Sequence, residues 1–245
     1  MINQQGGIKP EKAFHGLLGG GVLAIWSDID REHEEEFNNW YTHQHLPERV
    51  GMPGFLRGRR FISAPAFECT PGAKYFTLYE TETMETLASE PYMLRLNNPT
   101  DWTKKIVPIF RDGNRIACRV TASLGEGIGG YAATIEFGPS DGKENELRDW
   151  LRSHAMPRLL EKRPNLVAIH LMEADEATTR AKNQTEESKL AGMRGPLVRW
   201  VLMVEGMFDA DLAAACQELT DGMAAYGATN DVTVNRYQLL VSLSE

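Results

Sequence analysis

The sequence predicts an α+β fold in which one βαββαβ module occurs twice. Segments typical of strands and helices follow in the same order on either side of a stretch at 125–130, which holds four glycines in six residues. Trp40 and Pro47 lie seven residues apart in the first expected helix of the first half. Trp150 and Pro157 repeat that spacing in the second half. This shared order and spacing indicate a duplicated module.

The first module is expected at 22–125, after an N-terminal arm at 1–21. Its expected strands alternate apolar and polar residues or form short apolar runs, and they lie at 22–25, 55–64, 74–82 and 114–124. Asp30 can cap the first helix. Acidic residues fill the following turn, where the helix dipole favours them. Pro47 disfavours helical geometry at Leu46, so this helix should end or bend near His45. A short helix is expected at 84–89, and the segment 91–110 should be irregular or helical.

The second module is expected at 131–245. Its strands should lie at 132–137, 166–173, 197–205 and 231–243, and its helices at 143–160 and 209–224. The polar stretch at 173–195 is longer than the loop at the corresponding position in the first half. Loops this long are usually functional or disordered. We interpret it as a solvated hairpin tip, with a lid over a pocket as the alternative.

Apolar residues on both faces of the strands show how the modules should combine. A four-stranded sheet with both helices on one face leaves its other face bare, and a second copy of the sheet is the simplest cover. The strand near 200 carries apolar side chains on both faces, Val198, Trp200 and Leu202 against Leu197, Val201 and Met203. We therefore expect two ferredoxin-like modules that form a dimeric α+β barrel, a pseudo-dimer within one chain. Two separate domains are the alternative.

Composition narrows the class of protein. The 245 residues carry a net charge of −8 without a basic stripe, which argues against nucleic-acid binding. The three cysteines, Cys69, Cys118 and Cys216, are far apart and favour a reduced, cytoplasmic setting. The N-terminus has no apolar run long enough for a signal sequence or a membrane span. We expect a small-molecule substrate, no nucleic-acid or membrane partner, and leave a homo-oligomer open.

The densest group of chemically useful side chains is the segment 40–49. Tyr41 and His45 are four residues apart, so they share a helix face. A histidine with a pKa near neutral is a natural general acid or base, and a helix C-terminus would favour its protonated form. Glu48 is close enough in sequence to orient His45 or to pair with it. The alternative is that His45 only caps the last carbonyls of the helix.

The first half resembles the EthD-like family of dimeric α+β barrel proteins. The resemblance rests on the segments 40–49, 51–55, 59–61 and 74–80, which are similar to a pattern of the form WY…HLPER…PGF…RR. It covers about residues 22–125, and only His45 matches the family-type histidine; Gln44 stands where the family often has an acid. The resemblance implies small enzymes acting on ring-bearing or polyketide-like molecules, by decarboxylation, cyclisation, lactone isomerisation or cofactor-free oxygenation. Other branches bind haem.

The function we expect is a cofactor-independent lyase or isomerase acting on a small oxygenated aromatic or polyketide-like compound, by decarboxylation, a retro-aldol step or dehydration. His45 would be the general acid or base, and Tyr41 and Glu48 would support it. A haem-binding protein or cofactor-free oxygenase is one alternative, with His170 or His154 as the haem ligand. A non-catalytic binding module is another.

Candidate substrate-binding residues surround this segment. Arg60 and Arg59 on the second strand could hold a carboxylate or a developing enolate, although salt bridges to the acidic first helix would use them equally well. Aromatic and polar side chains that could line the same pocket are Trp40, His43, Tyr75, Tyr79 and Trp26. His43 and His45 diverge by about 200° on a helix, so we expect no metal site. We predict one working pocket near His45, with the second half as the wall that closes the barrel.

Overall fold

The computed structural model describes residues 16–65, 67–191 and 199–245. The strands that they form close into one antiparallel barrel in the order β1-β3-β2-β8-β5-β7-β6-β4. Their bounds are β1 Gly21–Ile29, β2 Phe55–Ser63, β3 Tyr75–Thr81, β4 Phe110–Gly125, β5 Tyr131–Phe137, β6 Leu166–Ala174, β7 Trp200–Gly206 and β8 Thr233–Ser244. The chain thus has a mixed α+β fold with a closed eight-stranded barrel.

Both halves of the barrel use the same strand order. The first half runs β4-β1-β3-β2 and the second runs β8-β5-β7-β6, so each places its first and third strands in the middle. β2 pairs with β8, and β4 pairs with β6, which joins the halves along both edges. The barrel therefore closes within one chain, and the alternative of two separate domains is wrong.

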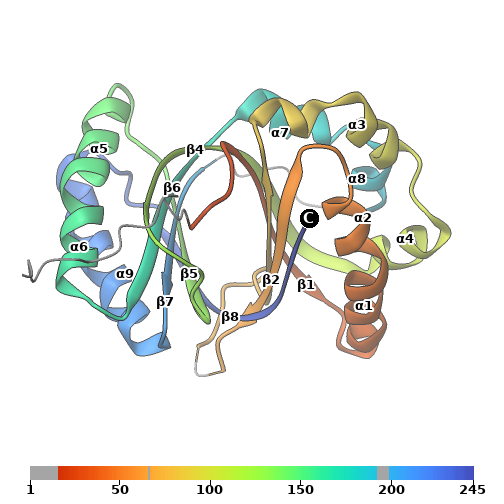
Figure 1. Ribbon diagram of the computed structural model, residues 1–245, viewed down its shortest axis with the longest axis horizontal. Coiled ribbons are helices and arrows are strands. Elements are labelled where there is room, and N and C mark those ends of the chain that lie inside the picture. Colours follow the sequence, from red (N-terminus) through yellow and green to blue (C-terminus); the bar gives the residue numbers. More distant parts are fainter. Residues whose placement is uncertain (1–15, 66, 192–198) are drawn as a thin grey trace, which may run out of the picture.

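Helices cover two opposite sides of the barrel (Figure 1). On one side lie α5 (Glu144–Trp150), α6 (Met156–Lys162) and α9 (Asp209–Met223). On the other side lie helices of the first half together with two short helices of the second. They are α1 Glu34–Trp40, α2 Leu46–Val50, α3 Glu90–Asn97, α4 Asp101–Ile106, α7 Glu176–Lys182 and α8 Glu186–Ala191. Across the described parts of the chain, no helix is both long enough and apolar enough to cross a membrane.

Pro47 had led us to expect that the first helix would end or bend near His45, and it does not end there. It continues through a π-helical turn, η2 (Tyr41–His45), into α2. The amide of Leu46 donates to the carbonyl of Tyr41, five residues back. This wider turn places Pro47 in the first turn of α2, where its missing N–H leaves no hydrogen bond unmade. Pro157 follows a matching π turn, η5 (Leu151–Ala155), in the second half.

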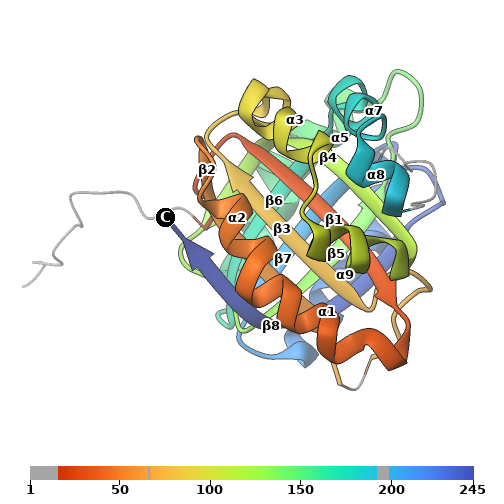
Figure 2. The same cartoon turned by 90° about the vertical axis from the view of Figure 1, so that its right-hand side faces the viewer.

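The stretch at 173–195 is not a solvated hairpin tip over the part that the structure describes, which ends at 191. It forms α7 and α8 on the first half's side of the barrel, where α8 contacts α3 and α4 (Figure 2). Asp175 caps α7 by accepting from the Thr178 amide at 2.8 Å. The side chains that α7 and α8 bury include Lys182, Glu187 and Ser188. Because these are polar, the segment gives no apolar pattern in the sequence.

Strand alternation sorts the buried side chains into two layers. The barrel interior holds Phe61, Phe76, Met203 and Tyr237, among others. It also holds a chain of ionised side chains, in which Arg59 donates to Glu80 at 3.0 Å and to Glu205 at 2.8 Å. The outer faces of the two half-sheets pack separate apolar clusters beneath their helices. The sheet therefore separates the barrel interior from the space under each helix layer.

Candidate functional site

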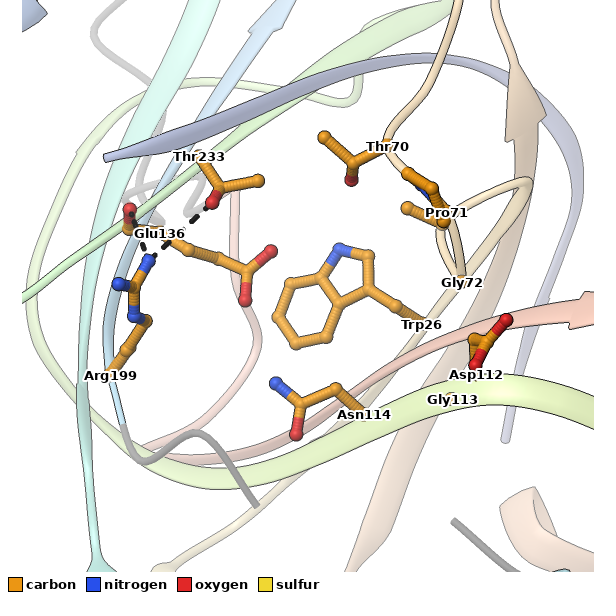
Figure 3. A pocket seen from close by; sticks show the side chains of 11 residues that line it. Trp26, Thr70, Pro71, Gly72, Asp112, Gly113, Asn114, Glu136, Arg199 and Thr233 are labelled. Atoms are coloured by element: carbon orange, nitrogen blue, oxygen red, sulfur yellow. Dashed lines mark hydrogen bonds between the residues drawn. The ribbon is translucent and has the colours of Figure 1, made fainter. Parts of the chain in front are cut away.

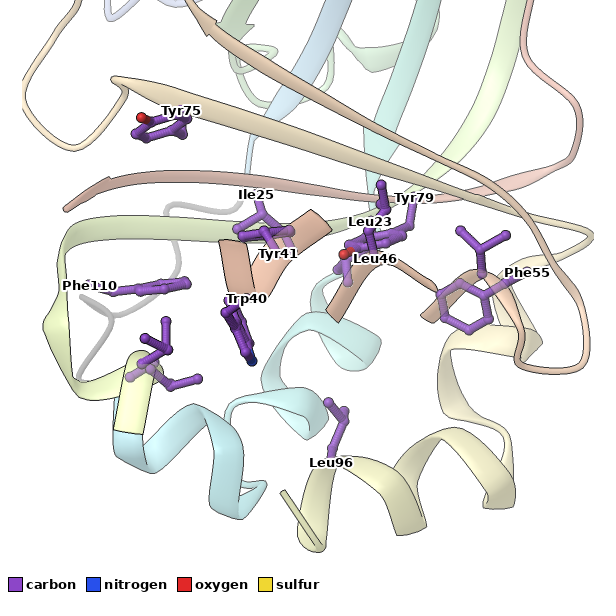
Figure 4. Packing of buried hydrophobic residues seen from close by; sticks show 14 of the residues in the cluster. Leu23, Ile25, Trp40, Tyr41, Leu46, Phe55, Tyr75, Tyr79, Leu96 and Phe110 are labelled. Atoms are coloured by element: carbon purple, nitrogen blue, oxygen red, sulfur yellow. The ribbon is translucent and has the colours of Figure 1, made fainter. Parts of the chain in front are cut away.

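His45 lies buried under the first half's helices, facing the outer surface of the sheet. Its ring centroid is 4.2 Å from the Trp40 ring and 5.0 Å from the Tyr41 ring, with Tyr79 at 6.4 Å. The π turn brings Tyr41 and His45 together, because it holds both on the sheet side of the helix. Trp40, Tyr41 and Tyr79 are seen in this layer in Figure 4. The structure thus assembles the predicted pair of Tyr41 and His45.

The imidazole of His45 is held in its neutral form. Burial lowers its pKa well below the usual value, and the positive charges of Arg49, Arg60 and Arg95 lower it further. This corrects our expectation of a protonated ring, which assumed that the helix ended at His45. Nδ1 of His45 has no hydrogen-bond partner among the described residues. A neutral ring with a free nitrogen can accept a proton.

Arg60 places a positive charge in the same layer. Its guanidinium carbon lies 3.9 Å from the centre of the Tyr41 ring and 5.6 Å from that of Tyr75. Nη2 of Arg60 donates to Oδ1 of Asn38 at 3.0 Å. Among the described residues, no carboxylate forms an ion pair with Arg60, although α1 carries several acids. This guanidinium is therefore available to a developing anion.

Tyr41, Tyr75 and Tyr79 contribute neutral phenols. Burial raises the pKa of Tyr41 above its ordinary value and that of Tyr79 well above it. Burial raises the pKa of Tyr75 to about 12, and its hydrogen bond to the Glu34 carboxylate adds to this effect. All three hydroxyl groups are protonated at neutral pH. They can donate hydrogen bonds but cannot act as bases there.

Glu48 does not reach His45 through any of its described hydrogen bonds. Its carboxylate accepts from Arg49 at 2.5 Å and also from Arg95. Arg49 in turn donates to Glu187 of α8 at 2.5 Å. Any electrostatic effect of Glu48 on the histidine therefore passes through Arg49 and Arg95, whose positive charges lower the His45 pKa.

Three predicted pocket residues are not brought to His45. Trp26 and Arg59 lie in the barrel interior, on the opposite face of the sheet. His43 is exposed on the outer side of the π turn. The described residues contain no group of three or more His, Cys, Asp or Glu side chains that could hold a metal ion.

The cavity beside His45 is small and closed by α8. Its volume is about 30 Å³, and Glu187, Ser188 and Ala191 of α8 form part of its wall. Such a volume is close to that of one water molecule, whereas sites for small molecules occupy about 300–1,000 Å³. In Figure 4 the cyan helices of this segment lie directly beside Trp40. A ring compound can reach His45 only if α8 moves.

Charged residues that the sequence did not single out surround this cavity. Arg115 donates to Ser188 at 2.5 Å and to Asn183 at 3.0 Å. Nζ of Lys182 lies 3.8 Å from the centre of the Tyr92 ring and has no hydrogen-bond partner among the described residues. Burial lowers the pKa of Lys182 well below its ordinary value. Arg49 belongs to the segment 40–49, whereas α7 and α8 show no apolar pattern in the sequence.

The second half has apolar side chains at the matching positions. Leu151 and Ala155 begin and end its π turn, where the first half has Tyr41 and His45. Leu171 occupies the place of Arg60 in β6, and Val204 occupies that of Tyr79 in β7. These side chains belong to a packed apolar cluster or border it.

Both histidines considered as haem ligands are poorly placed for that role. His170 is fully buried, with Nδ1 2.9 Å from the Ser123 hydroxyl and Nε2 3.2 Å from the Glu205 carboxylate. Both of its nitrogens are therefore already engaged. His154 is exposed in a shallow groove beside Trp150 and Glu218, away from the sheet. Neither residue offers a free nitrogen in an enclosed apolar cavity.

Comparisons with known proteins identify the fold. An anthrone oxidase-like protein has a TM-score of 0.59 at 12% identity, covering 91% of this chain and 92% of its own. A proposed monooxygenase from Fusobacterium nucleatum has a TM-score of 0.57 at 9% identity, with coverage of 94% and 96%. A variant of chlorite dismutase from Candidatus Nitrospira defluvii has a TM-score of 0.54 at 9% identity, with coverage of 90% and 92%.

These neighbours are dimeric α+β barrel proteins. The chain has the dimeric α+β barrel fold. No protein-family model matches the sequence, and no curated protein sequence matches it. At these identities the likeness concerns the fold alone.

Proposed function

We propose that the first half of this dimeric α+β barrel holds an active site in which neutral His45 removes a proton from a small oxygenated ring compound. The observation that carries the proposal is the joint burial, on one face of the sheet, of an uncharged imidazole and of a guanidinium that forms no ion pair with any described carboxylate. A base that is neutral at pH 7 can accept a proton, and a nearby fixed positive charge stabilises the anion that remains.

The first chemical step follows from this arrangement. A C–H or O–H bond of the substrate breaks, its proton moves to the imidazole of His45, and its electron pair forms an enolate or phenolate. Arg60 neutralises the new charge, and a phenol such as Tyr41 donates a hydrogen bond to the oxygen. The imidazolium that results lies near Arg49, Arg60 and Arg95, so it returns its proton readily. Proton transfer back to a different atom, or loss of a fragment, makes the enzyme an isomerase or a lyase.

Cofactor-free oxygenation is the second candidate, because it begins with the same anion. Two proteins with this fold are named as anthrone oxidase-like and as a proposed monooxygenase. An electron-rich enolate can pass electrons to dioxygen, whereas a neutral ketone cannot do so easily. The protein groups needed for the first step are the same in both candidates. The haem alternative receives no support from His170 or His154, so we derive no step through haem.

The proposal requires that α8 opens. The ion pair between Arg49 and Glu187 and the hydrogen bond from Arg115 to Ser188 hold α8 over the cavity. Both contacts join polar groups, which can exchange their partners for water when the helix lifts. Such motion of a short covering helix is common in enzymes that exclude water from a buried base.

We also propose that the chain derives from two fused ferredoxin-like modules related to the EthD-like family. The repeated strand order and the paired π turns before Pro47 and Pro157 support this proposal. In this view only the first module, within 22–125, keeps the reactive residues, and the second, at 131–245, serves mainly as the closing wall.

The test uses anthrone, an enolisable ring ketone, in deuterated buffer under nitrogen. Exchange of the methylene protons is followed by NMR with wild-type protein, with His45→Ala and with His154→Ala as the matched control. We expect His45→Ala to lower the catalysed exchange rate by at least about a hundredfold, in the range usual for a general base. His154→Ala should leave it unchanged, because that ring is exposed on the second half.

Two outcomes would count against the proposal. A catalysed rate in His45→Ala within about threefold of wild type, a difference below roughly 1 kcal/mol, would remove His45 as the base. No exchange with anthrone or 2-tetralone, combined with binding of either ketone, would favour a non-catalytic binding module. Admitting air distinguishes a cofactor-free oxygenase from an isomerase or lyase. The oxygenase would consume one O₂ per anthrone and yield anthraquinone and water.

A further inference from the structure

A second, larger cavity opens at one end of the barrel, on the opposite face of the sheet from His45. We name it the barrel-mouth pocket. Its volume is about 430 Å³, within the range of small-molecule sites. Both halves of the chain contribute to its wall, which is formed by Trp26, Thr70, Pro71, Gly72, Ala73, Asp112, Gly113, Asn114, Glu136, Arg199 and Thr233. Gly16 and Leu18 lie against His170 and Glu80, which do not line this pocket.

Glu136 aims a carboxylate into this pocket. Figure 3 shows the carboxylate and the Asn114 amide directed toward the Trp26 indole. The Glu136 residue is 7% exposed. Burial raises its pKa to about 7, and the nearby Arg199 and Asn114 oppose this effect only in part. The present partners therefore stabilise the ionised carboxylate only weakly, and a hydrogen-bond donor in the pocket would stabilise it further.

Arg199, the cation beside the pocket, is already engaged. Its guanidinium forms an ion pair with Asp231. It also donates to the Glu136 carbonyl and to the Thr233 hydroxyl, at 3.5 Å each. With the charge of Arg199 shared in this way, the lining favours a positive ligand over a negative one.

Trp26 offers a rigid aromatic surface. Its Nε1 donates to Thr134 at 3.3 Å, and its ring lies 5.2 Å from that of Phe76. These contacts fix the indole from within the barrel. Gly72 and Gly113 line the pocket without side chains, which leaves space in front of the ring. A carboxylate facing an indole across such a space is the combination that recognises organic cations.

We propose that the barrel-mouth pocket binds a small flat organic cation of the aromatic amidine class. Its ring would lie against Trp26, and its N–H groups would donate to the Glu136 carboxylate. This site is independent of the chemistry at His45, because the sheet separates the two.

The test is isothermal titration calorimetry with benzamidine, using neutral benzamide as the matched ligand. We expect benzamidine to bind wild type at pH 8 and Glu136→Gln to weaken that binding at least tenfold. Glu146→Gln, an exposed acid of α5, is the control and should bind as wild type does. Thr70→Trp fills the pocket from its loop without altering Glu136, and it should abolish binding. Circular dichroism would establish that each variant is folded.

Binding should also tighten as the pH rises. A cation favours ionised Glu136, so with a pKa near 7 the affinity should rise about tenfold between pH 6 and pH 8. The charged or titratable groups near Glu136 are Arg199, Cys118 and Tyr237. Burial raises the pKa of Cys118 and of Tyr237 far above this range, so both stay neutral.

Three results would overturn the proposal. Equal affinity for benzamidine and benzamide would show that charge is not recognised. Unchanged binding in Glu136→Gln, or in Thr70→Trp, would place the ligand elsewhere. Absence of benzamidine binding to the folded wild-type protein at millimolar concentration would remove the site.

Discussion

Glu205 lies at the centre of the ionised chain that crosses the barrel interior. Its carboxylate accepts two hydrogen bonds from Arg59, at 2.8 and 2.9 Å, and lies 3.2 Å from His170. Arg59 comes from the first half, whereas Glu205 and His170 come from the second. The change Glu205→Gln keeps the shape of the side chain but removes its charge. It therefore tests how strongly this contact joins the halves.

The pKa of Glu205 gives the size of the effect. Burial alone would raise this pKa, but the positive charge of Arg59 and the hydrogen bond and charge of His170 lower it to about 2 from 4.5. A pKa that is lower in the folded state adds stability above the unfolded value, and this stability is lost as the pH falls toward 2. The shift corresponds to about 3 kcal/mol at neutral pH. At pH 3 roughly 1 kcal/mol of it remains.

Urea unfolding at two pH values measures this contribution. At pH 7, Glu205→Gln should lower the free energy of unfolding by about 3 kcal/mol, and at pH 3 the difference from wild type should narrow to about 1 kcal/mol. Glu218→Gln, which breaks a surface pair with Lys162 and Arg163, is the control and should cost less than about 1 kcal/mol. A difference below 1 kcal/mol at pH 7, or one that does not change with pH, would refute this reasoning.

Three further predictions concern single residues. His45 should stay neutral when the pH falls from 8 through 6.5, because burial and nearby arginines lower its pKa. NMR of the imidazole nitrogens measures the charge of the ring, and titration near pH 6.5 would contradict the prediction. Lys182→Met should raise the free energy of unfolding by about 1 kcal/mol in urea, since it removes a buried amine without a hydrogen-bond partner; a loss would show that the amine stabilises the fold. Gly72→Ala should lower the free energy of unfolding by at least about 2 kcal/mol in the same assay. Gly72 has a φ of +86°, and a Cβ there would lie 2.1 Å from the Asp112 carbonyl oxygen. Gly127 has a similar φ but open space around it, so Gly127→Ala should lower the free energy of unfolding less. Equal losses in the two variants would refute the steric argument.

The fold could be predicted from the sequence because its signals are local and occur twice. The glycine-rich stretch at 125–130, the apolar strands and the paired Trp40 and Trp150 placed the elements in their correct order. The course of the first helix could not be predicted from Pro47 alone. A π turn accommodates that proline, and such a turn depends on packing rather than on local preference.

The candidate site was only partly predictable. The four-residue spacing of Tyr41 and His45 placed both side chains together, and strand alternation separated Arg60 from Arg59. The charge of His45 was not predictable, because it depends on burial and on arginines from distant segments. The covering of the site by α8 was not predictable either, since α8 comes from the second half and contacts the site with polar side chains such as Glu187.

The most direct test of the central claim is a crystal structure of the protein soaked with anthrone. Our account predicts ligand density between β3 and the helix that carries His45, with the carbonyl oxygen near Arg60 and α8 displaced. It predicts none at the matching position beside Ala155 and Leu171. Density beneath the second half's helices, or binding beside His45 with the carbonyl directed away from Arg60, would contradict the claim that the first half alone holds the working site.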